Sequence, residues 1–130
     1  MREKVEQRAH RRCEYCQAPQ GICAYTLHVD RIVPKSKGGP DSLVNFALAC
    51  FPCNNAKRAR ITGTDSESGK TEPLFNPRKQ KWDEHFEWSK DFKRIRGKTP
   101  TGRATVSQLK MNERLQVEAR PQWVKTKTWP

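Results

Sequence analysis

Two Cys-x-x-Cys pairs constrain the fold of this chain more than any other feature. Cys13 and Cys16 form the first pair, and Cys50 and Cys53 form the second. Cysteines at this spacing direct both thiolates at one metal ion, and two pairs complete the tetrahedral four-sulfur set of a structural zinc site. Only 34% of the 130 residues are hydrophobic, so the chain can bury only a small core. We therefore expect Zn²⁺ to contribute to folding.

Net charge indicates the class of partner. The chain has 26 Lys and Arg against 14 Asp and Glu, which gives +12. An excess of this size attracts polyanions, with nucleic acid first and anionic membrane second. No segment has the pattern of a basic amphipathic helix with a clear apolar stripe, so we expect no membrane partner.

Cysteine usage and the N-terminal sequence predict the compartment. The Cys-x-x-Cys spacing favours metal over disulfides, and the charged residues 1–12 do not resemble a signal peptide. No run approaches the ~18 apolar residues of a membrane span. We expect a cytoplasmic protein with one domain over residues 1–130, in which Cys23 is an inert thiol.

The segment around the cysteine pairs predicts two strands followed by a helix. Residues 25–33 alternate and are rich in β-formers, and a Gly-Gly turn at 35–41 leads to a second strand or extended segment at 43–49. A helix is expected over 53–61. The predicted fold class is α+β, with a small zinc-stapled core at about residues 10–61.

An extension at about residues 70–130 is expected to add short helices and a β-hairpin. Asn76 and Pro77 predict a helix start, because they match an N-cap and a first helical position. The remaining predictions are a helix over 2–12, a turn region at 62–70, a helix from 76 to about 84, strands at 85–88 and 92–95, and helices after 101–102 and over 112–119.

Three polar side chains in the core suit phosphodiester hydrolysis. That reaction needs a divalent metal that stabilises charge and a base that activates water. Asp30 at the end of the first strand supplies a carboxylate, and Asn54 at the start of the helix supplies an amide oxygen. Such hard oxygen ligands suit Mg²⁺ or Mn²⁺. Asn45 can orient a neighbour or simply bond the loop backbone.

The same residues carry a resemblance to the HNH endonuclease family. The matching motifs are Asp30-Arg31-Ile32-Val33-Pro34, Gly38-Gly39, Asn45-Phe46 and Cys50-Phe51-Pro52-Cys53-Asn54-Asn55-Ala56-Lys57. Residues 74–78, 82, 85–86, 88 and 99–104 resemble a small stand-alone bacterial, and especially cyanobacterial, subgroup. The resemblance implies a ββα-metal (His-Me finger) fold and metal-dependent cleavage of DNA. It also implies a catalytic metal at Asp30 and Asn54, with nicking of one strand by a monomer.

Arg31 departs from the family pattern, which has a general-base histidine at this position. An arginine stays protonated at neutral pH and is a poor base. Three readings follow. In the first, the protein has lost cleavage and kept nucleic-acid binding. In the second, another residue is the general base, with His28 as the first candidate and Tyr25 and His85 as more remote ones. In the third, Arg31 binds the scissile phosphate. His28 would share a face with Asp30 on a regular strand.

The sequence therefore predicts an HNH-type endonuclease acting on DNA, with RNA left open as a substrate. The alternatives are a non-catalytic nucleic-acid-binding module and a subunit of a larger nucleoprotein complex in defence, recombination or RNA-guided recognition. Basic residues expected to contact phosphates are Lys35, Lys37, Lys57, Arg58, Arg60, Arg78, Arg94, Arg96 and Arg103.

Overall fold

The computed structural model describes residues 1–21 and 27–125. Predictions for Cys23 and Tyr25 fall outside these residues. The elements of the N-terminal half, in chain order, are α1 (Arg2–Arg8), β1 (His28–Arg31), two 3-10 turns (Lys35–Lys37 and Leu43–Asn45), β2 (Phe46–Ala49) and α2 (Phe51–Lys57). Those of the C-terminal half are β3 (Thr62–Thr64), β4 (Thr71–Pro73), α3 (Trp82–His85), β5 (Phe86–Trp88), β6 (Ile95–Gly97), α4 (Pro100–Gln108) and α5 (Arg114–Lys125).

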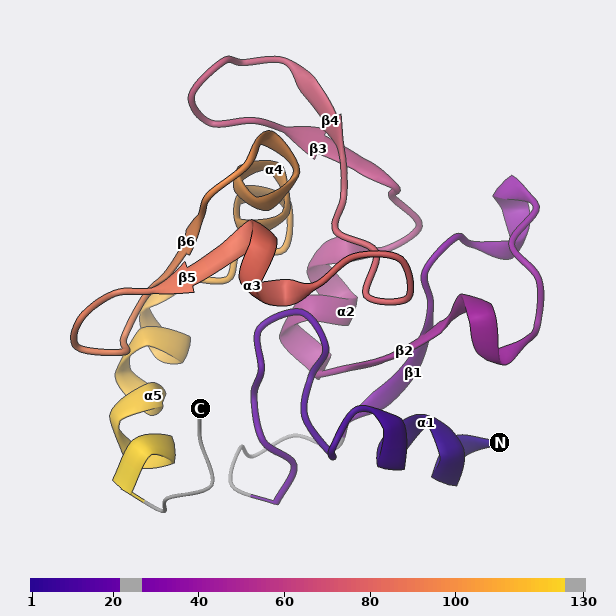
Figure 1. Ribbon diagram of the computed structural model, residues 1–130, viewed down its shortest axis with the longest axis horizontal. Helices are drawn as coiled ribbons and strands as arrows, with labels where there is room; N and C mark the ends of the chain where they lie inside the picture. The colour runs from indigo at the N-terminus through magenta and orange to yellow at the C-terminus, as the bar shows by residue number, and fades with distance from the viewer. Residues whose placement is uncertain (22–26, 126–130) are drawn as a thin grey trace.

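β1, β2 and α2 follow one another in the order that the sequence predicts. The two strands are antiparallel, with Asp30 opposite Ala47 and Arg31 opposite Phe46. α2 begins directly after β2, where Cys50 is the N-cap and Pro52 lies in the first turn, a position that proline tolerates well. The hairpin and the helix contact each other (Figure 1), so residues at the end of β1 lie beside α2.

The C-terminal half differs from the prediction in three places. Residues 62–73 form the β3–β4 hairpin around a turn at Asp65, where the sequence predicted only a turn region. The helix predicted from Asn76 is wrong, because residues 76–80 form turns and α3 begins only at Trp82. The β5–β6 hairpin is present, but its second strand lies at Ile95–Gly97, whereas the sequence predicted it at 92–95.

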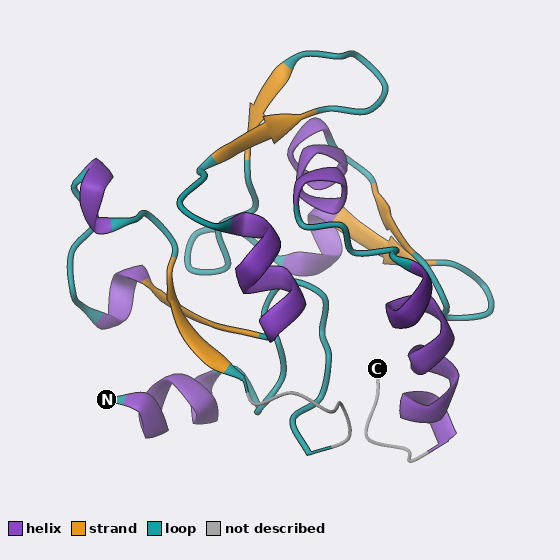
Figure 2. Cartoon of the chain, turned by 180° about the vertical axis from the view of Figure 1, so that it is seen from behind, coloured by secondary structure: helices purple, strands orange, loops and turns teal. Residues whose placement is uncertain are grey.

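The buried core draws on both halves of the chain. The cysteines and the β1–β2 hairpin share one hydrophobic cluster with Phe75, Phe86 and Trp123. The rings of Trp82 and Phe86 lie 5.1 Å apart, and those of Phe75 and Phe86 lie 5.2 Å apart. These aromatic side chains pack in or against the core. Figure 2 shows the three hairpins distributed around the helices.

Gly102 permits the close packing of α4 against the segment before it. A Cβ at this position would lie 2.0 Å from the carbonyl oxygen of His85, a contact that real side chains do not make. Thr99 caps α4 by accepting a hydrogen bond from the Gly102 N–H at 3.0 Å. In the described part of the chain, no helix combines the length and apolar character needed to cross a bilayer. The fold as a whole combines short helices with small sheets.

Candidate active site and zinc site

The four cysteines form a compact, buried cluster. Their Sγ atoms all lie within 4.8 Å of one another, and those of Cys16 and Cys50 are 3.6 Å apart. A tetrahedral zinc ion with Zn–S bonds of about 2.3 Å requires sulfurs about 3.8 Å apart. The cluster therefore has the chemistry and the dimensions to bind zinc.

The raised pKa of two of the buried thiols explains why this cluster needs a cation to become fully ionised. Hydrogen bonding with Cys13 raises the pKa of the thiols of Cys50 and Cys53, and burial adds to the effect. Four buried thiolates would repel one another, so a divalent metal must replace the thiol protons before all four sulfurs can become ligands.

Asp30 lies in a buried polar network at the end of β1. Its Oδ2 accepts a hydrogen bond from the Tyr15 hydroxyl at 3.2 Å and pairs with the Lys57 ammonium at 3.2 Å. The side chains of Lys57 and Asp30 are only 2% and 7% exposed. Lys57 also donates to the carbonyls of Arg31 and Ile32, so it ties α2 to β1.

Burial sets the ionisation of this network. Desolvation raises the pKa of the Asp30 carboxyl above its ordinary value, and the Lys57 ammonium opposes that effect. Desolvation likewise raises the pKa of the Tyr15 phenol, and the Asp30 charge raises it further. Tyr15 is therefore a hydrogen-bond donor to Asp30 and not a base at neutral pH. Oδ1 of Asp30 accepts no hydrogen bond from the described residues and is the atom that remains for a metal.

Arg31 is exposed and already paired. Its Nε lies 2.6 Å from Oδ1 of Asp41, and the two side chains are 45% and 52% exposed. The hydrogen bond to Asp41 and the carboxylate's charge raise the pKa of the guanidinium above its ordinary value. Arg31 therefore stays protonated and cannot take the histidine's role as a base.

Asn45 holds the loop between β1 and β2. Its Oδ1 accepts from the Val33 N–H at 2.9 Å, and its Nδ2 donates to the carbonyls of Val33 and Pro40 at 2.9 and 3.0 Å. The side-chain amide thus bonds loop backbone, which was one of the two readings open from the sequence. Gly39 has to be a glycine here, since a Cβ would lie 1.8 Å from the Val33 carbonyl oxygen.

Asn54 and His28 lie in more open positions. Asn54 is partly exposed in the first turns of α2, and its amide makes no hydrogen bond with the described residues. His28 is exposed at the start of β1, whereas Asp30 two residues on is buried. Nδ1 of His85 lies 2.7 Å from the Thr99 hydroxyl oxygen, close to the N-terminus of α4.

Residues 13–60 match the model of the HNH endonuclease family. Over this segment the chain is similar to the HNH endonuclease family. The matched range contains both cysteine pairs, the β1–β2 hairpin and α2. Neither a curated protein nor a solved structure matches the chain. The HNH match indicates nuclease-type chemistry on nucleic acid.

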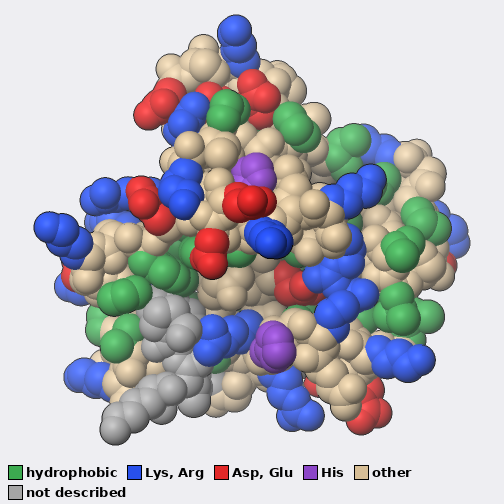
Figure 3. Space-filling view, viewed as in Figure 1, with side chains coloured by type: hydrophobic (Ala, Val, Ile, Leu, Met, Phe, Trp, Pro, Cys, Tyr) green, Lys and Arg blue, Asp and Glu red, His purple; other side chains and the backbone are tan. Residues whose placement is uncertain are grey.

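The basic residues predicted to contact phosphates are either paired with a carboxylate or exposed. Lys57 of the HNH segment is buried against Asp30. Outside it, Arg78 pairs with Glu14, and Arg103 pairs with Asp65 at 2.7 Å. The rest of the predicted set is exposed: Lys35, Lys37, Arg58, Arg60, Arg94 and Arg96. Figure 3 shows Lys and Arg side chains spread over the visible face, with acidic side chains among them.

Sequence reasoning missed Tyr15 and Asp41 as parts of the HNH segment's polar network. Tyr15 lies inside the first Cys-x-x-Cys pair, and its hydroxyl reaches Asp30 fifteen residues along the chain. Asp41 lies in the loop that leads to β2 and pairs with Arg31. A tyrosine between two metal ligands is a weak signal by itself, because nothing in the local sequence indicates which carboxylate it contacts.

Proposed function

We propose that this protein is an HNH-type endonuclease that hydrolyses phosphodiester bonds in DNA and nicks one strand as a monomer. The observation that carries the proposal is the Asp30 carboxylate, fixed by Lys57 and Tyr15 at the end of β1 beside the helix that carries Asn54. The family match over residues 13–60 supports the same chemistry.

Asp30 and Asn54 would hold the catalytic Mg²⁺ or Mn²⁺. Oδ1 of Asp30 and the amide oxygen of Asn54 are hard oxygen ligands, which these ions prefer. The bound metal would supply charge stabilisation at the phosphate. The Lys57 ammonium favours the ionised form of the buried Asp30 carboxyl and restricts it to one orientation, since it engages only Oδ2. Asn45 fixes the loop that follows β1.

The presence of Arg31 favours DNA cleavage that is slow or that uses another residue as the general base. Its side chain is protonated and exposed at the position where the family has a base. Arg31 would therefore contact a phosphate oxygen after exchanging its Asp41 partner. His28, exposed on the same strand, is the nearest imidazole in sequence that could accept the proton.

Plasmid nicking tests the proposal. Supercoiled DNA is incubated with the zinc-loaded chain or with Arg31→His, with Mg²⁺, with Mn²⁺ and with no added metal. We expect Arg31→His to nick only with added metal and to be faster than the unchanged chain. An imidazole general base contributes about 10²–10⁴-fold in rate. Asn54→Ala in the Arg31→His background should abolish nicking without loss of folding.

Plasmid nicking also shows whether the unchanged chain uses a substitute base or has lost cleavage. Nicking by the unchanged chain that disappears in His28→Ala identifies His28 as the substitute base. An inactive Arg31→His that still binds DNA contradicts the endonuclease proposal.

A non-catalytic nucleic-acid-binding module is the second candidate, and the Arg31–Asp41 pair favours it. Such a module would bind DNA equally well with and without Mg²⁺ and would nick only as Arg31→His. If its role is as a subunit of a larger nucleoprotein complex, its elution volume in gel filtration should shift when the partners are present.

A further inference from the structure

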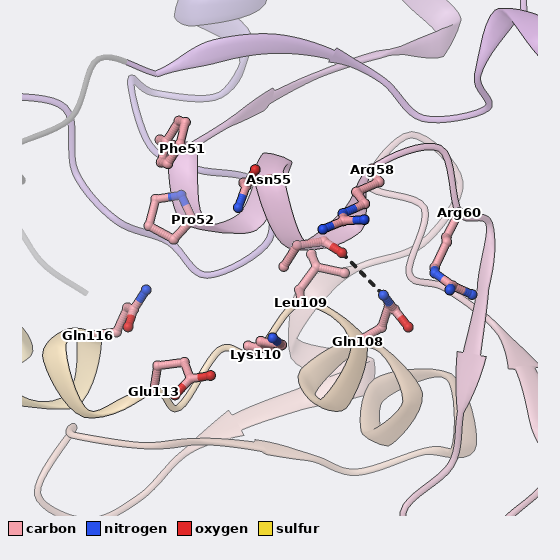
Figure 4. Close-up of a pocket in the computed structure, with 11 residues that line it drawn as sticks. Phe51, Pro52, Asn55, Arg58, Arg60, Gln108, Leu109, Lys110, Glu113 and Gln116 are labelled. Carbon is pink, nitrogen blue, oxygen red and sulfur yellow. Dashed lines mark hydrogen bonds between the residues drawn. The ribbon is translucent and has the colours of Figure 1, made fainter.

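A groove lies between the exposed residues of α2 and the connection from α4 to α5. It has a volume of about 390 Å³ and is lined on one side by Phe51, Asn55 and Arg58 and on the other by Lys110 and Glu113. Figure 4 shows these side chains facing the space from both elements. A hydrogen bond of 3.2 Å from Nε2 of Gln108 to the Ala56 carbonyl joins the two sides. Asp30 and Asn54 are not among the lining residues.

The groove collects cations that have no ion-pair partner among the described residues. Arg58, Arg60 and Lys110 line it and are exposed, whereas Arg31, Arg78 and Arg103 are each paired with a carboxylate. Glu113 supplies the negative charge of the lining, so three cations and one anion give a local charge of +2. Unpaired cations around a hollow favour a polyanionic ligand.

Arg58 adds a second, independent observation. Its backbone has φ 53° and ψ −133° at the C-cap of α2, a conformation that suits glycine and costs another residue about 1–3 kcal/mol. Its N–H donates to the Asn54 carbonyl at 3.0 Å, so the last turn of α2 holds this geometry. The last turn of α2 thus fixes the backbone from which the Arg58 side chain lines the groove.

We propose that this groove binds the phosphate backbone of the DNA strand on one side of the cut, through Arg58, Arg60 and Lys110. The inference rests on the proposed function for the position of the cut. Lys57, the last residue of α2, donates to β1, and the next residue, Arg58, lines the groove. A helix is about 10 Å across, which corresponds to about three base steps at 3.4 Å each. The groove therefore engages phosphates a few nucleotides from the scissile bond.

Fluorescence anisotropy measures the binding directly. The probe is a labelled DNA duplex of about 20 base pairs, titrated over a salt series with zinc-loaded protein and no added Mg²⁺ or Mn²⁺. The groove variant combines Arg58→Gly, Arg60→Ser and Lys110→Ser. The matched control removes the same charge from exposed lysines outside the groove, as Lys4→Ser, Lys70→Ser and Lys90→Ser.

We expect the groove variant to bind about tenfold or more weakly than the unchanged chain. Three lost phosphate contacts should reduce the slope of log K against log salt by about 2.7, at about 0.9 per contact. The control should change the slope by less than about one. Glu113→Gln removes the anion of the groove and should tighten binding about two- to threefold. A gain of affinity cannot result from misfolding.

Equal losses in the groove variant and the control would overturn the proposal, as would unchanged affinity in Glu113→Gln. Competition by poly-glutamate as effective as that by unlabelled duplex would overturn the assignment to nucleic acid. Tighter binding of an RNA duplex through the same residues would overturn the assignment to DNA. These outcomes are separate from nicking. Failed nicking with intact groove effects refutes only the catalytic proposal, and active nicking with neutral groove variants refutes only the groove.

Discussion

Replacing Lys57 with methionine should destabilise the protein by about 3–5 kcal/mol at neutral pH, the usual cost of removing one partner from a buried ion pair. The change leaves Asp30 buried with the Tyr15 hydroxyl as its remaining donor. It also removes the ammonium donor from the carbonyls of Arg31 and Ile32. Methionine fills a similar volume, so the loss reports charge and hydrogen bonding more than packing.

The cost of Lys57→Met should depend on pH in a defined direction. Burial already raises the folded-state pKa of Asp30, and loss of the ammonium raises it further. A carboxyl with a raised folded pKa contributes stability below its unfolded value of about 3.9 and loses that contribution as pH rises through the folded value. The destabilisation should therefore be greatest at neutral pH and should shrink toward about pH 4.

Urea unfolding of the zinc-loaded protein, followed by far-ultraviolet circular dichroism, measures this cost. The unchanged chain, Lys57→Met, Asp30→Asn and the double variant form a double-mutant cycle. We expect the double variant to be more stable than Lys57→Met alone, because it has no uncompensated charge. A Lys57→Met cost below about 1 kcal/mol, or strictly additive single losses, would refute the assignment of a buried pair. If Lys57→Met does not fold, recovery of folding in the double variant still decides the question.

Three further predictions concern the zinc site, the β1–β2 loop and the β3–β4 turn. Cys50→Ser should lose zinc, by metal analysis, and helical signal by circular dichroism, whereas Cys23→Ser should lose neither. Asn45→Ala should lower the free energy of unfolding by about 2–4 kcal/mol, because three hydrogen bonds to loop backbone are lost. Arg103 holds the pKa of Asp65 well below its usual range, so this pair adds stability above the ordinary aspartate pKa that is lost as pH falls. The drop in melting temperature on acidification should therefore be smaller in Arg103→Met.

Spacing in the sequence was enough to predict the cysteine cluster and the order of strands and helix around it. Two Cys-x-x-Cys pairs can bring four sulfurs together in few ways, and their Sγ atoms do lie within 4.8 Å of one another. The hairpin likewise follows from alternating β-formers on either side of a glycine-containing turn. The hairpin signal is local in the sequence, and the cysteine signal is fixed by the need of one metal ion for four sulfur ligands.

Predictions failed where a local signal met a competing contact. Asn76 resembled a helix cap, but its Oδ1 accepts from the Arg78 N–H and its own N–H donates to Gln80, which closes a turn. Lys57 resembled a phosphate contact at the end of an exposed helix. The fold buries it because Asp30 lies opposite on β1. The turn at Asn76 and the burial of Lys57 could not be predicted from the local sequence pattern, since each depends on which side chain the fold brings into contact.

Tyr15 links the cysteine cluster to the alignment of the candidate active site. It stands between Cys13 and Cys16, so the two sulfurs that would hold zinc also fix the direction of its phenol toward Asp30. Loss of zinc would free this donor and leave the carboxylate with Lys57 alone, although no residue of the candidate active site had changed. Partial zinc loading would thus divide a preparation into aligned and misaligned molecules. Specific activity should then scale with zinc content even before unfolding is detectable.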